Sequence, residues 1–94
     1  MIRVTFLYPK TDESTFDMGY YTSTHMPMLA AALGEHCHGW GADRITNGPY
    51  EAIGWALVSS AEAFGAATEG GEVRADVANY SSVHPEVVIG DVVR

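Results

Sequence analysis

The sequence predicts an α+β fold whose elements follow the order β-α-β-β-α-β. Segments in which apolar and polar residues alternate, typical of strands, occur near both ends of the chain and as a pair in its middle. Two segments with apolar residues three and four positions apart, typical of helices, separate them. This order is that of the ferredoxin-like fold, a four-stranded antiparallel sheet with both helices on one face.

Length, charge and cysteine content narrow the possible functions. The 94 residues suffice for a single domain, residues 1–94. A net charge of −7 without any basic cluster argues against nucleic acid as a partner. No apolar run approaches the roughly 20 residues that cross a membrane, and no signal peptide is visible before the first strand. Cys37 is the single cysteine and cannot form an internal disulfide, so we expect a cytoplasmic protein.

The first predicted strand, residues 2–8, presents different side chains on its two faces, and Pro9 ends it. One face is apolar and aromatic, whereas the other mixes polar and apolar residues. The mixed face indicates contact with something other than bulk water. The apolar face carries Ile2, Val4, Phe6 and Tyr8, and the mixed face carries Arg3, Thr5 and Leu7.

The first predicted helix buries an ionisable side chain. Asp17 is its N-cap, and Gly34 supplies a left-handed stop. Pro27 removes one amide donor inside the helix, so we expect the carbonyl of Ser23 to be freed and the helix to bend beside His25. The apolar stripe of this helix consists of Met18, Tyr21, His25, Met28, Leu29 and Ala32.

Two strands joined by a turn follow. Residues 36–45 alternate but include two glycines, so we expect a bent or bulged strand there. The turn at residues 46–49 contains Asn-Gly, a strong turn signal. Residues 50–59 form the central strand, in which large side chains alternate with small ones that let a helix approach closely. The large residues are Ile53, Trp55 and Leu57, and the small ones are Ala52, Gly54 and Ala56.

A second helix and a last strand complete the fold. A Ser-x-x-Glu capping box at residues 59–62 predicts the start of this helix, on which Phe64 is the main inward anchor. The last strand is predicted over residues 81–93. Pro85 places it on a sheet edge or at a bulge, and its irregular alternation predicts a bulge near Gly90.

Two helices can cover only one face of such a sheet. The opposite face keeps apolar side chains such as Leu7 and Trp55, which a domain of this size does not leave in water. The simplest way to bury them is a second copy of the chain, packed sheet to sheet. We therefore expect a symmetric homodimer.

Five segments spread over nearly the whole chain carry a family resemblance, namely Arg3–Pro9, Phe16–Tyr21, Thr24–Pro27, Asp76–Tyr80 and Pro85–Val92. They are similar to the EthD-like family, which is named after ethyl tert-butyl ether degradation. The resemblance implies ferredoxin-like subunits paired into a dimeric α/β barrel. Relatives on this fold include polyketide-type dehydratases, cyclases, lactone isomerases and monooxygenases that use no cofactor. Within the matching segments, His25 corresponds to the family's recurring histidine.

Three residues are candidates for catalysis. His25 could act as a general base or acid on an activated carbon or an enol, or it could be structural and bind the carbonyl that Pro27 frees. Tyr80 could donate a hydrogen bond to a substrate carbonyl, and Asp76 could orient the imidazole, although both residues would equally suit loop pinning. We expect Tyr20 to face solvent or a subunit contact.

A set of apolar and aromatic residues could line a ligand pocket or form plain core. It comprises Leu7, Tyr21, Trp40, Trp55 and Phe64. We expect no metal. His36 and His38 have the spacing of two ligands in a strand, but Cys37 points the other way and no third ligand is evident.

The sequence leaves three functions open. The first is a homodimer that binds a small hydrophobic or phenolic metabolite between sheet and helices. It would use His25, without a cofactor, for proton-transfer, dehydratase or oxygenase-type chemistry in a degradation or polyketide-like pathway. The second is a non-catalytic ligand-binding or accessory protein of an oxygenase system, with the same pocket. The third is a purely structural oligomer.

Overall fold

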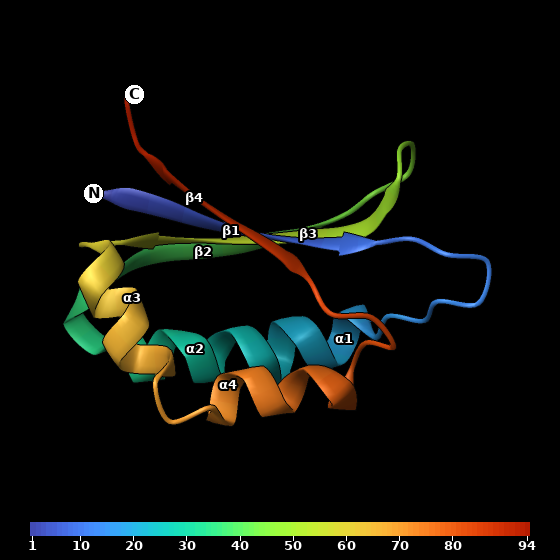
Figure 1. The fold of residues 1–94 in the computed structure, drawn as a ribbon, viewed down its shortest axis with the longest axis horizontal. Helices are drawn as coiled ribbons and strands as arrows, with labels where there is room; N and C mark the ends of the chain where they lie inside the picture. Colours follow the sequence, from blue (N-terminus) through green and yellow to red (C-terminus); the bar gives the residue numbers. More distant parts are fainter.

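The computed structural model covers residues 1–94 and has all its helices on one face of a single sheet (Figure 1). The four antiparallel strands lie in the spatial order β2-β3-β1-β4. They are β1 (Ile2–Pro9), β2 (Cys37–Arg44), β3 (Tyr50–Val58) and β4 (Glu86–Asp91). The predicted ferredoxin-like α+β fold is therefore confirmed.

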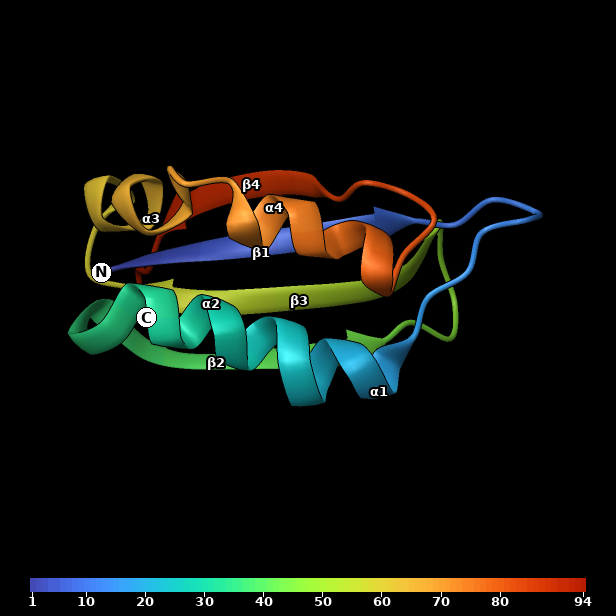
Figure 2. The same cartoon turned by 90° about the horizontal axis from the view of Figure 1, so that it is seen from below.

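The helical layer consists of two rows that run side by side beneath the sheet (Figure 2). The first row lies next to β2 and β3 and consists of α1 (Met18–Tyr20), a π-helical segment (Tyr21–His25) and α2 (Met26–Leu33). The second row lies on the side of β1 and β4 and consists of α3 (Ala61–Thr68), α4 (Glu72–Ala75) and a 3₁₀ segment (Asp76–Asn79). A further 3₁₀ turn (Gly34–His36) leads from α2 into β2. None of these helices has the length and apolar character that crossing a membrane requires.

The predicted alternation of the two central strands is confirmed. In β1 the residues buried beneath the helices are Ile2, Val4, Phe6 and Tyr8. In β3 the small residues Ala52 and Ala56 are buried, whereas the large residues lie on the open face of the sheet. A Cβ atom added at Gly54 would overlap the hydroxyl of Tyr21. The small face of β3 therefore sets how closely the first row of helices can approach.

The first helix is irregular beside His25, and the irregularity takes the form of a π-helical turn. The N–H of Met26 donates to the carbonyl of Tyr21, five residues back, at the point where α2 begins. Pro27 then occupies the first turn of α2, where a missing amide is tolerated. Asp17 caps the start of the row as predicted, because its carboxylate accepts a backbone N–H.

The second helix begins one residue later than the capping box predicts. Ser60 caps α3 in place of Ser59, because its hydroxyl accepts the backbone N–H of Ala63 at 3.1 Å. The backbone N–H of Ser59 instead donates to the carbonyl of His36 at 3.0 Å, which extends the pairing of the middle strands. The hydroxyl of Ser59 hydrogen-bonds to Nε2 of His38 at 2.8 Å.

The sequence pattern predicts the irregular pairing of the edge strand β2 correctly but fails for the other edge strand, β4. The bulge predicted in β2 is confirmed, since the register with β3 shifts between Cys37 and Gly39, and Gly39 has a φ of 150°. The bulge predicted near Gly90 is wrong, because β4 pairs with β1 without any register shift. β4 also begins at Glu86 and not at Ser81. Its residues are exposed on both faces, so burial imposes no alternation on them.

Candidate functional site

A histidine and an aspartate meet where the two rows of helices pack together. His25 ends the π-helical segment and is 4% exposed, and Asp76 opens the 3₁₀ segment after α4 and is 7% exposed. Nδ1 of His25 lies 2.9 Å from Oδ2 of Asp76. The two residues are 51 positions apart in the chain, so only the packing of the rows brings them together.

The carboxylate of Asp76 is held by two further donors. The hydroxyl of Tyr20 donates to Oδ1 at 2.7 Å, and the side-chain amide of Asn79 donates to the same oxygen at 2.9 Å. Burial alone raises the pKa of Asp76, but the hydrogen bonds from Tyr20, Asn79 and His25 outweigh it, so the pKa lies below its usual value. Asp76 is therefore ionised at neutral pH.

These contacts leave His25 with one free ring nitrogen. Burial lowers the pKa of His25 below the usual 6.5, although the hydrogen bond to Asp76 acts in the opposite direction. The ring is therefore neutral at pH 7, and its proton lies on Nδ1, because the ionised carboxylate can only accept. Nε2 has no hydrogen-bond partner within the protein. It carries a lone pair that a ligand can reach.

Aromatic rings fix the plane of this imidazole. Tyr21 stacks on His25 with ring centroids 5.5 Å apart and planes at 13°, and the centroid of Tyr80 lies 4.5 Å from that of His25. The hydroxyls of Tyr80 and Tyr8 are hydrogen-bonded at 2.6 Å. Burial raises the pKa of both tyrosines well above 10, so both hydroxyls stay protonated and can act as donors.

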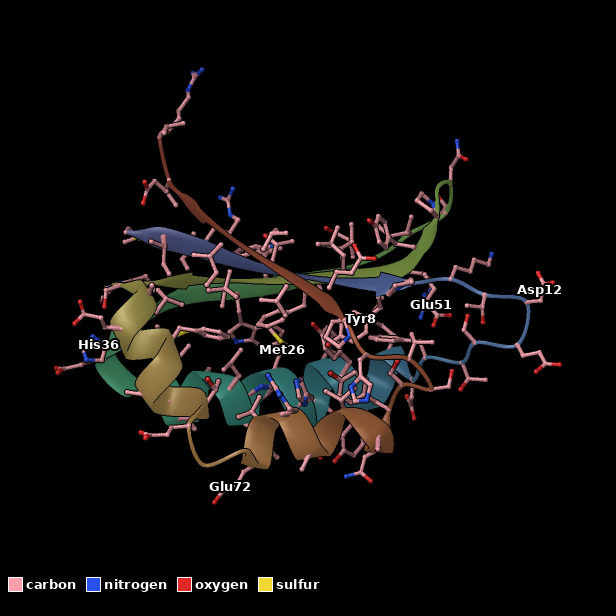
Figure 3. The ribbon with its side chains drawn as sticks, viewed as in Figure 1. Tyr8, Asp12, Met26, His36, Glu51 and Glu72 are labelled. Carbon is pink, nitrogen blue, oxygen red and sulfur yellow. The ribbon has the colours of Figure 1, made fainter.

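The ring of His25 borders a cavity of about 840 Å³. The cavity lies between β1 and the second row of helices, and the chain before β4 contributes to its wall. Figure 3 shows Tyr8, which also lines the cavity, reaching from β1 into the layer between sheet and helices. The apolar part of the wall consists of Phe6, Phe64, Val73, Val77 and Val87. Such a size and lining are typical of small-molecule sites.

Tyr80 lines a different, more open hollow of about 680 Å³. This hollow lies beside the start of α1 and is also bordered by Arg44. Tyr80 does not line the His25 cavity and acts on it only indirectly, through its hydrogen bond with Tyr8 and its ring contact with His25. Nowhere in the structure do three or more histidine, cysteine, aspartate or glutamate side chains gather as metal ligands would.

The structure separates the other residues that the sequence suggested for ligand binding. Phe64 lines the His25 cavity. Tyr21 is fully buried against the imidazole and is not part of the cavity wall. Trp40 packs against the core from the helix-facing side of β2. Leu7 and Trp55 lie on the open face of the sheet, on the opposite side from the cavity.

Sequence patterns missed three members of this site. Tyr20, expected at solvent or a subunit contact, is half-buried and hydrogen-bonds to Asp76. A 3.6-residue period puts Tyr20 and His25 on different faces, but the π-helical turn lets both reach the same carboxylate. Asn79 could have been found from its place three residues after Asp76, and Tyr8 from its place on the apolar face of β1.

A solved structure decides the family. An EthD-like protein from Ralstonia eutropha JMP134 matches with a TM-score of 0.88 and 34% sequence identity, over 99% of this chain and 92% of that one. The chain belongs to the EthD-like family. No protein-family model and no curated protein sequence matches this EthD-like chain.

Two more distant structures share the fold of this EthD-like chain. An ethyl tert-butyl ether degradation (EthD) family protein from Bacillus halodurans C-125 matches with a TM-score of 0.71 and 17% identity, over 98% of both chains. A candidate antibiotic biosynthesis monooxygenase from Bordetella bronchiseptica matches with a TM-score of 0.56 and 16% identity, over 99% of this chain and 97% of that one. At these identities the likeness concerns the fold alone.

Proposed function

We propose that this EthD-like protein binds a small hydrophobic or phenolic metabolite in the His25 cavity and moves a proton to or from it. One observation carries the proposal: Nδ1 of His25 is bound to the ionised Asp76 while Nε2 is free at the cavity wall. A carboxylate in this position holds the tautomer of the ring and stabilises the imidazolium that forms when the ring takes a proton. His25 is the catalytic residue, and Asp76 is a positioning residue that acts through it.

The reaction begins at an acidic C–H beside a carbonyl, or at a phenolic or enolic O–H. Nε2 of His25 takes this proton. Tyr8 lines the cavity and keeps its hydroxyl proton, so it donates a hydrogen bond to the substrate oxygen on which negative charge develops, while the hydroxyl of Tyr80 donates to that of Tyr8. The imidazolium then returns the proton. Delivery to another carbon completes an isomerisation, and delivery to a leaving hydroxyl completes a dehydration. Proton transfers of this kind require no cofactor.

The proposal includes a homodimer formed through the open face of the sheet. That face carries no helix (Figure 1), and its large apolar side chains are half-buried or exposed in the single chain. They are Leu7, Ile53, Trp55, Leu57 and Val88. A second copy packed sheet to sheet would remove this surface from water.

We further expect the protein in the cytoplasm, where the free thiol of Cys37 stays reduced.

Proton transfer can be measured without knowing the metabolite. In D₂O, 2-tetralone exchanges the hydrogens next to its carbonyl, and NMR follows the loss of their signals. We expect the wild-type protein to accelerate this exchange and His25→Gln to reduce the acceleration by on the order of 100-fold or more, the typical contribution of a general base. The exchange rate with Asp76→Asn should lie between those with the wild type and with His25→Gln. His36→Gln changes an exposed histidine away from the cavity and should match the wild type.

The outcomes separate the candidate functions. A wild-type exchange rate no faster than that of His25→Gln would contradict proton transfer by this histidine. Titration with 2-tetralone, followed through the ring signals of His25, then decides between the remaining functions. Shifts of these signals would favour the non-catalytic binding protein, and their absence would favour the structural oligomer.

A further inference from the structure

The His25 cavity has a charged rim. Besides His25 and Tyr8, three ionisable side chains line it, and they come from different segments of the chain. Arg74 lies on α4, Glu69 follows α3, and His84 precedes β4. All three are exposed, whereas His25 is buried. We therefore describe Arg74, His84 and Glu69 as the rim of the cavity and His25 as its floor.

Arg74 is a free cation in the folded chain. The single ion pair of the structure joins His25 and Asp76, so no carboxylate lies within ion-pairing distance of the Arg74 guanidinium. Glu69 lines the same cavity without reaching it. The protein has only five lysine and arginine residues against twelve aspartate and glutamate residues. An unpaired guanidinium at an apolar cavity is therefore not explained by a surplus of basic side chains.

The charges of the floor and the rim favour one orientation for an acidic ligand. At neutral pH the pair that His25 at the floor forms with Asp76 behind it carries a net negative charge, because Asp76 is ionised and His25 is neutral. A ligand carboxylate is thus repelled from the floor and attracted to the rim. There the planar guanidinium of Arg74 offers a fork of donors that matches a carboxylate, and the imidazole of His84 has at least one N–H donor in either protonation state.

We propose that the cavity selects aromatic or hydrophobic compounds that carry a carboxylate, and that Arg74, assisted by His84, binds this carboxylate at the rim. The apolar part of the ligand lies against Phe6 and Phe64, which orients the reacting C–H or O–H towards His25. This assignment rests on the proposed function in using the same cavity. Glu69 opposes it, because its charge competes for Arg74 and repels the ligand.

Two compounds of the same shape test the proposal by isothermal titration calorimetry, 2-naphthoate and its neutral counterpart 2-naphthamide. We expect wild-type protein at low ionic strength to bind 2-naphthoate about tenfold more tightly than 2-naphthamide, as one charge-assisted contact allows. Added salt should weaken this preference, because the rim is exposed.

Variants assign the preference to the rim. Arg74→Gln should remove the preference for 2-naphthoate while leaving the affinity for 2-naphthamide unchanged. Glu69→Gln should increase the preference for 2-naphthoate severalfold. Arg44→Gln changes an exposed arginine at the other hollow and should retain the wild-type preference. These residues are exposed, so the variants should fold, and circular dichroism checks this.

Each outcome decides a different point. Equal affinity of the wild type for the two compounds, or an equal loss of both in Arg74→Gln, would show that the carboxylate assignment is wrong while the cavity remains a ligand site. Failure of both compounds to bind would contradict the cavity as a ligand site, and the proposed function would fail together with the carboxylate assignment.

Discussion

The protonation state of His25 results from two opposing influences on one ring. Burial disfavours the imidazolium, and the neighbouring carboxylate of Asp76 favours it. Burial is the larger influence, so the ring is neutral at pH 7 and ready to accept a proton. The carboxylate then stabilises the charge only after the ring has taken up the proton, which is the behaviour that proton transfer requires.

His25 should make the protein less stable below about pH 6.5. The unfolded chain protonates its histidines near pH 6.5, whereas the folded-state pKa of His25 is lower. Between the two values the unfolded state binds more protons, so the free energy of unfolding decreases as the pH falls. The folded-state pKa of Asp76 lies below its usual 3.8, so protonation of Asp76 in stronger acid decreases the free energy of unfolding further.

Urea unfolding at a series of pH values measures this effect. The loss that begins near pH 6.5 should disappear in His25→Gln and remain in His36→Gln, which changes an exposed histidine. Identical profiles for the wild type and His25→Gln would show that His25 titrates alike in the folded and unfolded chain.

At the scale of elements, the site depends on how the first helical row lies on β3. Tyr21 is completely buried, and its hydroxyl lies directly over Gly54 without a hydrogen-bond partner. The ring of Tyr21 also stacks on His25. Any change that lifts Tyr21 from the strand therefore also moves the imidazole.

Gly54→Ala should destabilise the protein by about 1–3 kcal/mol, the usual cost of an extra methyl group in a packed core. Its Cβ would meet the hydroxyl and ring carbons of Tyr21, which have no free space to move into. Gly65→Ala is the matched control, because an added Cβ meets nothing there and alanine favours the helix α3, so we expect a gain of about 0.5–1 kcal/mol. Thermal unfolding of the variants measures both.

Tyr21→Phe tests whether the hydroxyl of Tyr21 causes the loss of stability in Gly54→Ala. This hydroxyl is buried and unpaired, so its removal should leave the stability unchanged or raise it. In the double variant Tyr21→Phe/Gly54→Ala, part of the loss should be recovered, because the closest clash is removed. Strictly additive effects in this cycle would contradict the close approach.

At the scale of the whole molecule, the open face of the sheet is a partly apolar surface that no helix covers. A homodimer through this face would give an assembly of two chains. It would leave the cavity accessible, since the cavity lies on the helical side of the sheet.

Trp55→Glu tests the homodimer. A charge at the centre of the open face should shift the protein from dimer to monomer in sedimentation velocity at micromolar concentration, because burying a carboxylate, even near the Arg3 guanidinium, is costlier than burying the indole that it replaces. Val93→Glu adds the same charge at a position that is 94% exposed outside the sheet and should remain dimeric. A wild-type protein that sediments as a folded monomer would contradict the dimer.

Local patterns in the sequence determined which side chains of the two central strands are buried and predicted that His25 points inward. Alternation assigned the two faces of β1 and β3, and helical spacing directed His25 inward, because burial repeats with the period of the element itself. Where burial imposed no period, as in the exposed strand β4, the pattern predicted a bulge that does not exist.

Tertiary structure alone decided which side chains meet. The contact of His25 with Asp76, the recruitment of Tyr20 through a π-helical turn, and the gathering of Phe64 and Arg74 around one cavity join segments from different parts of the chain. Periodicity describes one element at a time, whereas these contacts depend on how the rows of helices and the sheet are placed relative to one another.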